Sequence, residues 1–348
     1  MKEKLLGKVI IGDIKQLKKS FEEFSSITAD LNLQHEELLE PSHTNLKTIS
    51  EAVELSSHGT FDRREIRRIK FEPTDKQGWW LKRSDIDGDP VKISHKNAFY
   101  VYEGGVNNIV LKRNGDKKNY MRLTEHIIAI RMGSDIDNML ITVDSDDPPL
   151  FDLGSAPIIE ALDKVERVRT KEPCRYFTVK ETVSAVWANG AFLTIAPQDP
   201  DCYSLKVDCA INFPNAMGKQ RICFVVDEDN FKMGSSARTN CSLKHAILCK
   251  TIGKFIPSVR HLGYNKKNIL VVGNKKYFNR PRLKHKGKPL EAVWHRATLD
   301  LLAAFALVDE GRFIGDVISY KSNHKYDVEL IKELYKRDLL IEVIPQSK

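Results

Sequence analysis

The sequence predicts an α+β fold, and two observations carry this prediction. Segments with the two-residue period of strands and segments with the helical period follow one another without regular β-α-β alternation. The chain has 348 residues, of which 41% are hydrophobic and 29% charged, and this is enough to build two separate cores. We expect an extension over residues 1–44, a first domain over residues 45–171 and a second domain over residues 172–348.

The N-terminal extension contains an apolar stripe of helical spacing. Five apolar side chains recur at spacings of four, three, four and three: Ile10, Ile14, Leu17, Phe21 and Phe24. Lysine and glutamate side chains lie off the stripe. Such a helix packs either on the body of the protein, which we favour, or on another subunit or a membrane surface. Self-association through this helix therefore stays open.

Strand patterns dominate the first domain. Before it, residues 31–41 are polar and acidic and predict a linker. Residues 67–72 alternate, a turn with proline and glycine follows, and residues 79–83 form the next expected strand. Residues 85–89 are rich in aspartate like a calcium loop, but the terminal glutamate of such loops is missing, so we expect a turn. Residues 135–143 predict a further strand.

The second domain mixes short strands with helices. The expected strands are residues 175–180, 192–195, 203–207 and 317–320, and the expected helices are residues 245–256 and 327–336. In the last of these helices, the apolar side chains Leu330, Ile331 and Leu334 form the expected buried face.

Residues 123–130 hold the strongest chemical signal. Glu125 and His126 stand at the start of an expected helix, which Thr124 can cap and whose body is apolar. Neighbouring residues on a helix point about 100° apart, so these two side chains cannot pack on each other. They can share a site if His126 binds a metal ion and Glu125 reaches a water on that ion. On its own, such a dipeptide is usually a surface pair.

Further motifs follow this pair in a specific order. They are Glu125-His126, the strand at residues 135–143, Asp152-x-Gly154-Ser155-Ala156-Pro157, Ala237-Arg238-Thr239, residues 295–300, and Tyr320-Lys321-Ser322-x-His324. In this order they resemble the zinc-dependent UDP-3-O-acyl-N-acetylglucosamine deacetylase family of lipid A biosynthesis, over nearly all of the chain beyond its N-terminal extension. The order is specific, whereas no single motif is. The resemblance implies two similar domains, each a β-sheet layered on α-helices, with the active site between them.

The resemblance also implies an activity, a cofactor and a set of roles. The activity is zinc-dependent hydrolysis of the acetyl group from a UDP-3-O-acyl-N-acetylglucosamine. The implied zinc ligands are His126, His295 and Asp300, with a fourth position left for water. The other implied roles are general base for Glu125, oxyanion hydroxyl for Thr239, a charged histidine that assists the oxyanion and the leaving amine for His324, and substrate contacts for Lys321 and Arg296. Together they supply a Lewis acid, a base, oxyanion donors and an acid.

The second ligand segment departs from the family pattern. The family spaces its histidine and aspartate four residues apart, on one helical face, whereas His295 and Asp300 are five apart. Five residues turn a regular helix by about 140°, so both can face one ion only if the helix bulges. If Asp300 keeps its place, Arg296 falls at the histidine position. A second family aspartate, which orients the catalytic histidine, is replaced by Ala304.

Two readings therefore stay open. In one, a bulge brings His295 to the metal and the chain is a working deacetylase. In the other, the fold persists without its metal site, and the chain is a catalytically impaired relative with a binding or regulatory role. The combined presence of five residues favours continued use of the pocket in either case: Glu125, His126, Thr239, Lys321 and His324.

The net charge and the cysteines limit the possible partners and the cellular compartment of the protein. The net charge of +8 suits a phosphate-bearing partner, or lysine-rich loops that keep the protein in solution. Residues 275–288 are very basic but form no recognisable nucleic-acid module, so we expect no nucleic-acid partner. No apolar run nears the roughly 18 residues of a membrane span, and residues 9–11 are too short for a signal core. Six cysteines without a Cys-x-x-Cys pair indicate reduced thiols, so we expect a cytoplasmic protein.

Overall fold

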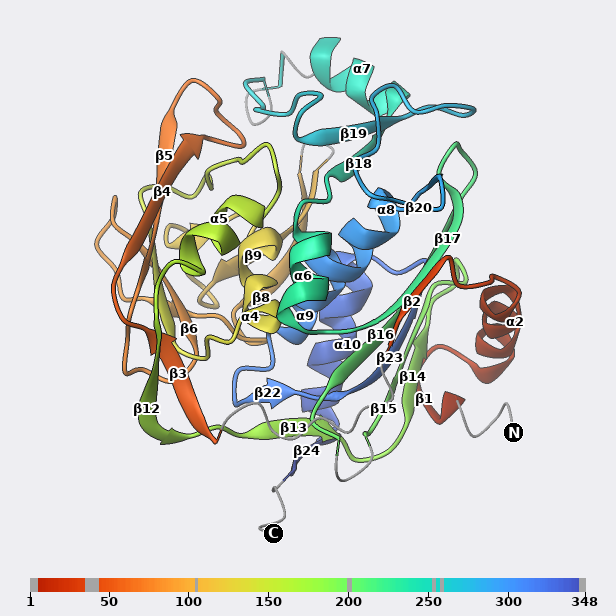
Figure 1. The fold of residues 1–348 in the computed structure, drawn as a ribbon, viewed down its shortest axis with the longest axis horizontal. Helices are drawn as coiled ribbons and strands as arrows, with labels where there is room; N and C mark the ends of the chain where they lie inside the picture. The colour runs from red at the N-terminus through yellow and green to blue at the C-terminus, as the bar shows by residue number, and fades with distance from the viewer. Residues whose placement is uncertain are drawn as a thin grey trace.

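The structure, a computed structural model, describes residues 6–34, 44–103, 106–198, 202–251, 255–256 and 260–343. The α+β class is confirmed, because sheets and helices form separate layers rather than alternating along the chain (Figure 1). A five-stranded and a seven-stranded sheet lie on opposite sides of a group of helices (Figure 1). The division into two domains near residue 171 stays a prediction.

The five-stranded sheet follows the alternation of its sequence. Its strands, in spatial order, are β4 (Val53–His58), β5 (Ile66–Glu72), β11 (Met139–Val143), β6 (Trp79–Arg83) and β7 (Val91–Lys92). Ile69 and Phe71 on β5, like Trp79 and Leu81 on β6, are buried and two residues apart, so one face of the sheet is apolar. Smaller sheets comprise β8 (Ala98–Glu103) with β9 (Val106–Lys112) and β10 (Tyr120–Met121), and β3 (Asn45–Ile49) with β12 (Arg167–Pro173).

The seven-stranded sheet is covered on both faces. Its spatial order is β1 (Lys8–Ile11), β14 (Val183–Val186), β15 (Phe192–Ala196), β23 (Gly315–Tyr320), β16 (Leu205–Phe213), β17 (Gly218–Val225) and β2 (Leu31–Leu33). Successive side chains point to opposite faces. Leu193 and Cys209 belong to the core shared with the helices, on what we call the inner face. Phe192 and Ala210 belong to a separate cluster on the outer face.

The N-terminal extension pairs with both edges of this sheet. β1 runs parallel to β14 at one edge and β2 runs parallel to β17 at the other. Between them, α2 (Ile14–Ser25) crosses the outer face. The prediction of a linker from residue 31 is wrong at its start, because Leu31 and Leu33 pack against the main core from an edge strand. The rest of that segment, residues 35–43, lies outside the described residues.

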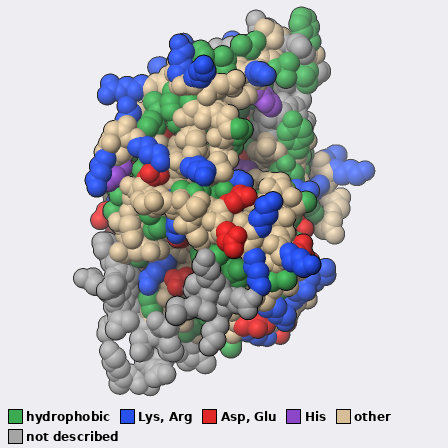
Figure 2. All heavy atoms as spheres, turned by 90° about the vertical axis from the view of Figure 1, so that its right-hand side faces the viewer, with side chains coloured by type: hydrophobic (Ala, Val, Ile, Leu, Met, Phe, Trp, Pro, Cys, Tyr) green, Lys and Arg blue, Asp and Glu red, His purple; other side chains and the backbone are tan. Residues whose placement is uncertain are grey.

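The apolar stripe of α2 is buried on the protein's own body. Leu17, Phe21 and Phe24 share a cluster with Phe192, and the rings of Phe24 and Phe192 meet edge to face at 5.7 Å. Two members of the predicted stripe differ: Ile14 is 42% exposed, and Ile10 lies on strand β1 and not on the helix. Of the two outcomes left open for this helix, packing on the body of the protein is therefore the one observed. On this side of the molecule, lysine and arginine side chains are scattered among other groups (Figure 2).

The helices of the interior lie between the two large sheets (Figure 1). They are α3 (Glu125–Ile128), α4 (Ile130–Gly133), α5 (Ala156–Leu162), α6 (Glu228–Ser235), α8 (Glu291–Trp294), the π-helix η2 (His295–Leu301), α9 (Leu302–Phe305) and α10 (His324–Lys336). α8, η2 and α9 follow one another directly over residues 291–305, which we call the central helix. Nearly all of its side chains are buried, because it contacts both the inner face and α3.

A β-α-β unit lies at the top of the molecule in Figure 1. It consists of β18 (Thr239–Ser242), α7 (Leu243–Thr251) and β19 (Ile269–Val272), with β18 parallel to β19. The remaining strands are β13 (Tyr176–Val179), β20 (Lys284–His285), β21 (Lys288–Pro289), β22 (Arg312–Phe313) and β24 (Leu340–Val343). In the described ranges no helix combines the length and apolar character that crossing a membrane requires. The six cysteines are free.

Candidate active site

The central helix changes its hydrogen bonding at the predicted ligand segment. His295–Leu301 is a π-helix with α-helical turns on both sides. A π-helix bonds residue i to residue i+5, so residues five apart lie near each other on its surface. This π-turn is the bulge that the first of the two readings requires. It brings Asp300 to the side of the helix on which His295 lies.

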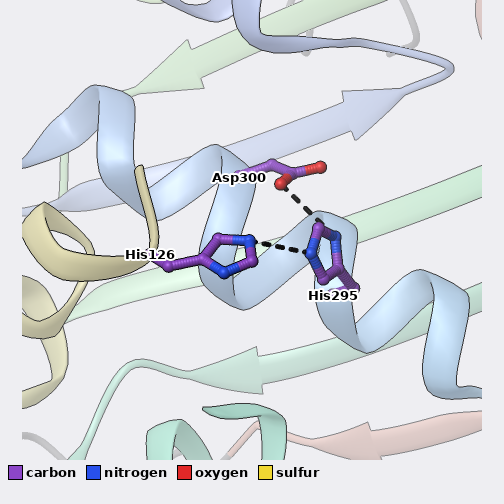
Figure 3. Close-up of side chains that lie close together, drawn as sticks. All are labelled: His126, His295 and Asp300. Atoms are coloured by element: carbon purple, nitrogen blue, oxygen red, sulfur yellow. Dashed lines mark hydrogen bonds and ion pairs between the residues drawn. The ribbon is translucent and has the colours of Figure 1, made fainter. Parts of the chain in front are cut away.

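His126, His295 and Asp300 come together from α3 and the central helix (Figure 3). Their ligand atoms all lie within 4.8 Å of one another. Nε2 of His126 lies 3.1 Å from Nε2 of His295, and Nδ1 of His295 lies 3.3 Å from Oδ1 of Asp300. This Oδ1 is buried, and no well-aligned hydrogen bond reaches it from the described residues. The three predicted ligands, which we call the cluster, can therefore reach one ion.

The protonation states of His126 and Asp300 fit a divalent cation. Burial and the neighbouring His295 lower the pKa of His126 to about 3, so its imidazole is neutral. Burial alone would raise the pKa of Asp300, but His295 and His324 outweigh it and hold that pKa well below its usual range. Two nitrogens bound to one tetrahedral zinc ion lie roughly 3.3 Å apart, close to the separation seen here. Two imidazoles and a carboxylate, with a position left open, form the donor set of a catalytic zinc.

Glu125 and His324 flank the cluster. Glu125 is 3% exposed, its Oε2 accepts the Ile109 backbone N–H at 3.0 Å, and burial raises the pKa of its carboxyl to about 8. His324 begins α10, and its Nε2 lies 3.4 Å from Oδ1 of Asp300 and 3.9 Å from Oε1 of Glu125. Burial lowers the pKa of His324, although Asp300 acts to raise it. A carboxyl group and an imidazole thus stand beside the cluster, within reach of each other.

Two threonines near the cluster have different hydroxyl contacts. Thr239 begins β18, and its Oγ1 lies 2.9 Å from Nε2 of His295. Thr124 precedes α3, but its hydroxyl donates to the backbone carbonyl of Ile109 at 2.9 Å and makes no cap bond. The predicted cap is therefore wrong, because β9 competes for that hydroxyl. Since the Ile109 N–H also binds Glu125, β9 holds the start of α3 at two points.

The two predicted substrate contacts have different surroundings. Lys321 lines the cavity described below, has a left-handed backbone (φ 52°), and places its Nζ 3.2 Å from Oε2 of Glu23 on α2. Arg296 is 6% exposed, and its Nη2 donates to both carboxylate oxygens of Asp327, at 2.5 and 2.6 Å. The charge of Arg296 is therefore compensated within the protein. Asp327 was not predicted from the sequence, where its one signal is its place three residues after His324 on the same side of α10.

A second buried ion pair, also missed from the sequence, holds β18 in place. Nε of Arg238 donates to Oε1 of Glu291 at 2.7 Å, and both side chains are almost fully buried. Glu291 begins the central helix, and Arg238 directly precedes Thr239. The pair therefore ties the strand that carries Thr239 to the helix that carries His295.

The cluster opens into a cavity of about 1070 Å³, and all the predicted site residues line it. The β-α-β unit adds apolar side chains to its wall, among them Leu243, Ile247 and Ile269. Leu150 and Phe151, before α5, add two more. The wall thus combines titratable groups with apolar side chains, which suits a ligand that has both polar groups and an apolar chain.

Known proteins are similar to this sequence over most of its length. The chain matches the family model described as UDP-3-O-acyl N-acetylglycosamine deacetylase over residues 46–336. It is similar to proteins named UDP-3-O-acyl-N-acetylglucosamine deacetylase from Brucella ovis, Brucella abortus and Brucella melitensis. Each is 27% identical over 303 residues, which make up 86% of this chain and 98% of the relative. β1, α2 and β2 precede the matched range. The chain belongs to the UDP-3-O-acyl N-acetylglycosamine deacetylase family.

Proposed function

We propose that this protein is a zinc-dependent hydrolase that removes the acetyl group from a UDP-linked 3-O-acyl-N-acetylglucosamine, a step of lipid A biosynthesis. The observation that carries the proposal is the π-turn, which brings His295 and Asp300 to His126 despite their five-residue spacing. Glu125 and His324 lie beside these ligands, where the reaction needs a base and an acid. Family membership supports the substrate class.

The residues around the cluster have separate tasks in this reaction. His126, His295 and Asp300 would hold a zinc ion, which would supply a Lewis acid for the acetyl carbonyl and for an attacking water. Glu125 accepts a proton from that water, and its raised pKa makes its carboxylate a stronger base than an ordinary glutamate. Thr239 donates a hydrogen bond to the carbonyl oxygen as it becomes negative. His324 donates a proton to the amine as the C–N bond breaks, which leaves acetate and a free amino sugar.

The cavity matches the two chemical ends of this substrate. Lys321 offers an ammonium group to the diphosphate. The apolar side chains of the β-α-β unit, such as Leu243 and Ile247, offer an apolar wall to the acyl chain. Burial of that chain supplies binding free energy in proportion to its apolar area.

The alternative, a relative that binds the ligand without hydrolysing it, loses most of its support. It rested on the five-residue spacing and on Arg296 facing the metal. The π-turn accommodates the spacing, and Asp327 compensates the charge of Arg296. One departure remains: Ala304 replaces the carboxylate expected beside His324, whose buried Nδ1 has no hydrogen bond among the described residues. We therefore expect turnover at a reduced rate.

Metal analysis and two variants test the proposal. The purified protein should hold about one zinc ion, and His126→Ala should lose it. Glu125→Ala should keep the zinc but lose roughly 10²–10⁴-fold in the rate of acetate release from UDP-3-O-acyl-N-acetylglucosamine. Protein that stays metal-free after zinc is added, with an unchanged melting temperature, would contradict the proposal.

A further inference from the structure

We propose that the buried pair Arg296–Asp327 is a positioning pair for the metal site. It orients the carboxylate of Asp300 toward the cluster, and it keeps uncompensated positive charge away from the cation. The inference rests on the proposed zinc-dependent function. It goes further by assigning part of the metal affinity to two residues that are not ligands.

Asp327 is held on both of its oxygens. It is 2% exposed, and both oxygens accept hydrogen bonds from Nη2 of Arg296. Its Oδ1 also accepts the hydroxyl of Ser322 at 2.7 Å. Because Asp327 lies one helical turn after His324 on α10, this pair joins the helix that carries His324 to the helix that carries the cluster.

The other edge of the Arg296 guanidinium faces Asp300. Nη1 of Arg296 lies 3.7 Å from Oδ2 of Asp300, and neither Nη1 nor Nε makes a hydrogen bond to any described residue. The other oxygen of Asp300, Oδ1, lies within 3.4 Å of Nδ1 of His295 and Nε2 of His324. Arg296 therefore attracts Oδ2 and leaves Oδ1 turned toward the cluster. The pair thus favours the orientation of the Asp300 carboxylate in which Oδ2 faces Arg296 and Oδ1 faces the cluster.

Asp327 is needed because Arg296 alone would oppose a cation. Repulsion between a guanidinium group and a divalent ion is strong in a buried site, and the carboxylate of Asp327 offsets it. A buried ion pair is by itself weak evidence of a stabilising role, because apolar side chains of similar volume often stabilise a core as well. The rest of the central helix, including Leu299 and Leu301, is largely apolar. The demands of the metal site explain this pair better than the stability of the core.

The test separates orientation of the metal site from support of the fold. The double variant Arg296→Met/Asp327→Leu removes both charges and keeps similar volume, so it should melt close to the wild type. Its zinc affinity, measured by competition with a chelating dye, should fall by about 10–100-fold, as for other groups that orient metal ligands. Asp327→Asn leaves Arg296 uncompensated and should lose at least as much zinc affinity.

A second arginine–aspartate pair provides the matched control. Arg221 binds Asp208 through two nitrogens, with Nη2 2.6 Å from Oδ2, between strands β16 and β17 and outside the cluster. Arg221→Met/Asp208→Leu should therefore keep wild-type zinc affinity.

Each outcome supports or overturns the inference. If Arg296→Met/Asp327→Leu binds zinc as tightly as the wild type, the pair only supports the fold and the inference is overturned. Should that variant fail to fold, Arg296→Lys decides, because it keeps the charge and loses the planar fork. Weaker zinc binding by Arg296→Lys supports the inference, and unchanged binding overturns it. A wild type that takes up no zinc overturns the proposed function, and this inference with it.

Discussion

The two faces of the seven-stranded sheet are covered by helices of opposite character. On the outer face, α2 starts at Asp13, whose carboxylate accepts the backbone N–H groups of Lys15 and Gln16. The apolar side chains of α2 follow regular helical spacing, and its charged side chains are exposed. On the inner face, the central helix contains a π-turn and buries both His295 and Arg296.

This difference separates a helix that follows local rules from one that breaks them. A π-turn is a rare irregularity, and buried charge costs free energy unless a partner compensates it. In the central helix that partner is Asp327, which comes from another element. Local exceptions of this kind tend to occur at functional sites, where the rest of the fold must support them. α2 therefore has the pattern of a helix that stabilises the fold, and the central helix has the pattern of a candidate functional site.

A change of one residue in helix length should distinguish the two helices most. An alanine inserted after Lys18 would rotate Phe21 and Phe24 by about 100° away from the sheet. Each buried apolar side chain contributes roughly 1.5–3 kcal/mol, so the free energy of unfolding should fall by several kcal/mol. Urea unfolding measures this loss of stability, and the zinc affinity of the same insertion variant is the second quantity to measure.

The matching change in the central helix should be tolerated. Deleting Ala297 removes the residue that the π-turn holds in excess, so His295 and Asp300 fall four apart on one face of an α-helix. We expect the deletion variant to fold and to bind zinc. Loss of folding or of zinc binding would mean that the π-turn itself is required.

The C-terminal end of the central helix should show a pH-dependent contribution to stability. Asp309 follows this helix and contacts Lys92 on β7, with Oδ2 2.8 Å from Nζ. Burial acts to raise the pKa of Asp309, but contacts with His95 and Lys92 outweigh it and lower the pKa to about 2. A lowered pKa adds stability above the unfolded value of about 3.9 and loses it as pH falls toward 2. Asp309→Asn should therefore lower the free energy of unfolding by about 2 kcal/mol at pH 7 and by almost nothing near pH 2.

An exposed pair is the control for this measurement. Asp338 also pairs with a lysine, Lys180, but its side chain is 90% exposed. Asp338→Asn should leave the urea midpoint unchanged at both pH values. Equal effects of the two substitutions would show that the contact of Asp309 with β7 adds no more stability than an exposed ion pair does.

Restoring a carboxylate to the central helix should raise the rate at some cost in stability. Ala304 is 1% exposed on α9, which packs against α10, and the buried Nδ1 of His324 has no hydrogen bond among the described residues. If Ala304→Asp reaches that nitrogen, kcat should rise about tenfold, the lower end of the range for such partners. The melting temperature should fall, because the surrounding side chains are apolar.

The neighbouring residue gives the control. Ala303 is equally buried and points about 100° away on the same helix. Ala303→Asp should destabilise the protein without raising kcat. An Ala304→Asp variant with the rate of Ala303→Asp would show that position 304 no longer serves His324.

The smallest effect should come from a contact between α2 and the cavity. Glu23 binds Lys321 at 3.2 Å, and that bond holds the pKa of Glu23 below its usual range, so its carboxylate competes with a diphosphate for the lysine. In Glu23→Gln, UDP should bind up to about fivefold more tightly at low salt, since exposed ion pairs are worth about 0.2–1 kcal/mol. The gain should shrink in about 1 M salt, which screens exposed charges. Calorimetry with UDP measures both, and Glu22→Gln, an exposed neighbour, should bind UDP like the wild type.

Much of the fold and of the site was predictable from short segments. The α+β class, most strands and the α2 stripe follow from apolar periodicity, which each segment carries by itself. The site residues were found from the order of short motifs. The irregular turn was one of two outcomes that the sequence left open, because His295 and Asp300 can face one ion at a five-residue spacing only if the helix bulges.

The sequence by itself thus determined most of the elements and the candidate ligands and catalytic groups, because period, spacing and motif order are local properties. Only the tertiary structure decided which partner compensates each charged side chain and which segments pair at the edges of a sheet. Arg296 meets Asp327 from 31 residues further on, and Lys321 meets Glu23 across 298 residues. β2 was missed because three residues carry too little periodicity, and pairing with β17 is what defines the strand. An ion pair or an edge strand depends on where two distant segments pack, and neither segment alone encodes that position.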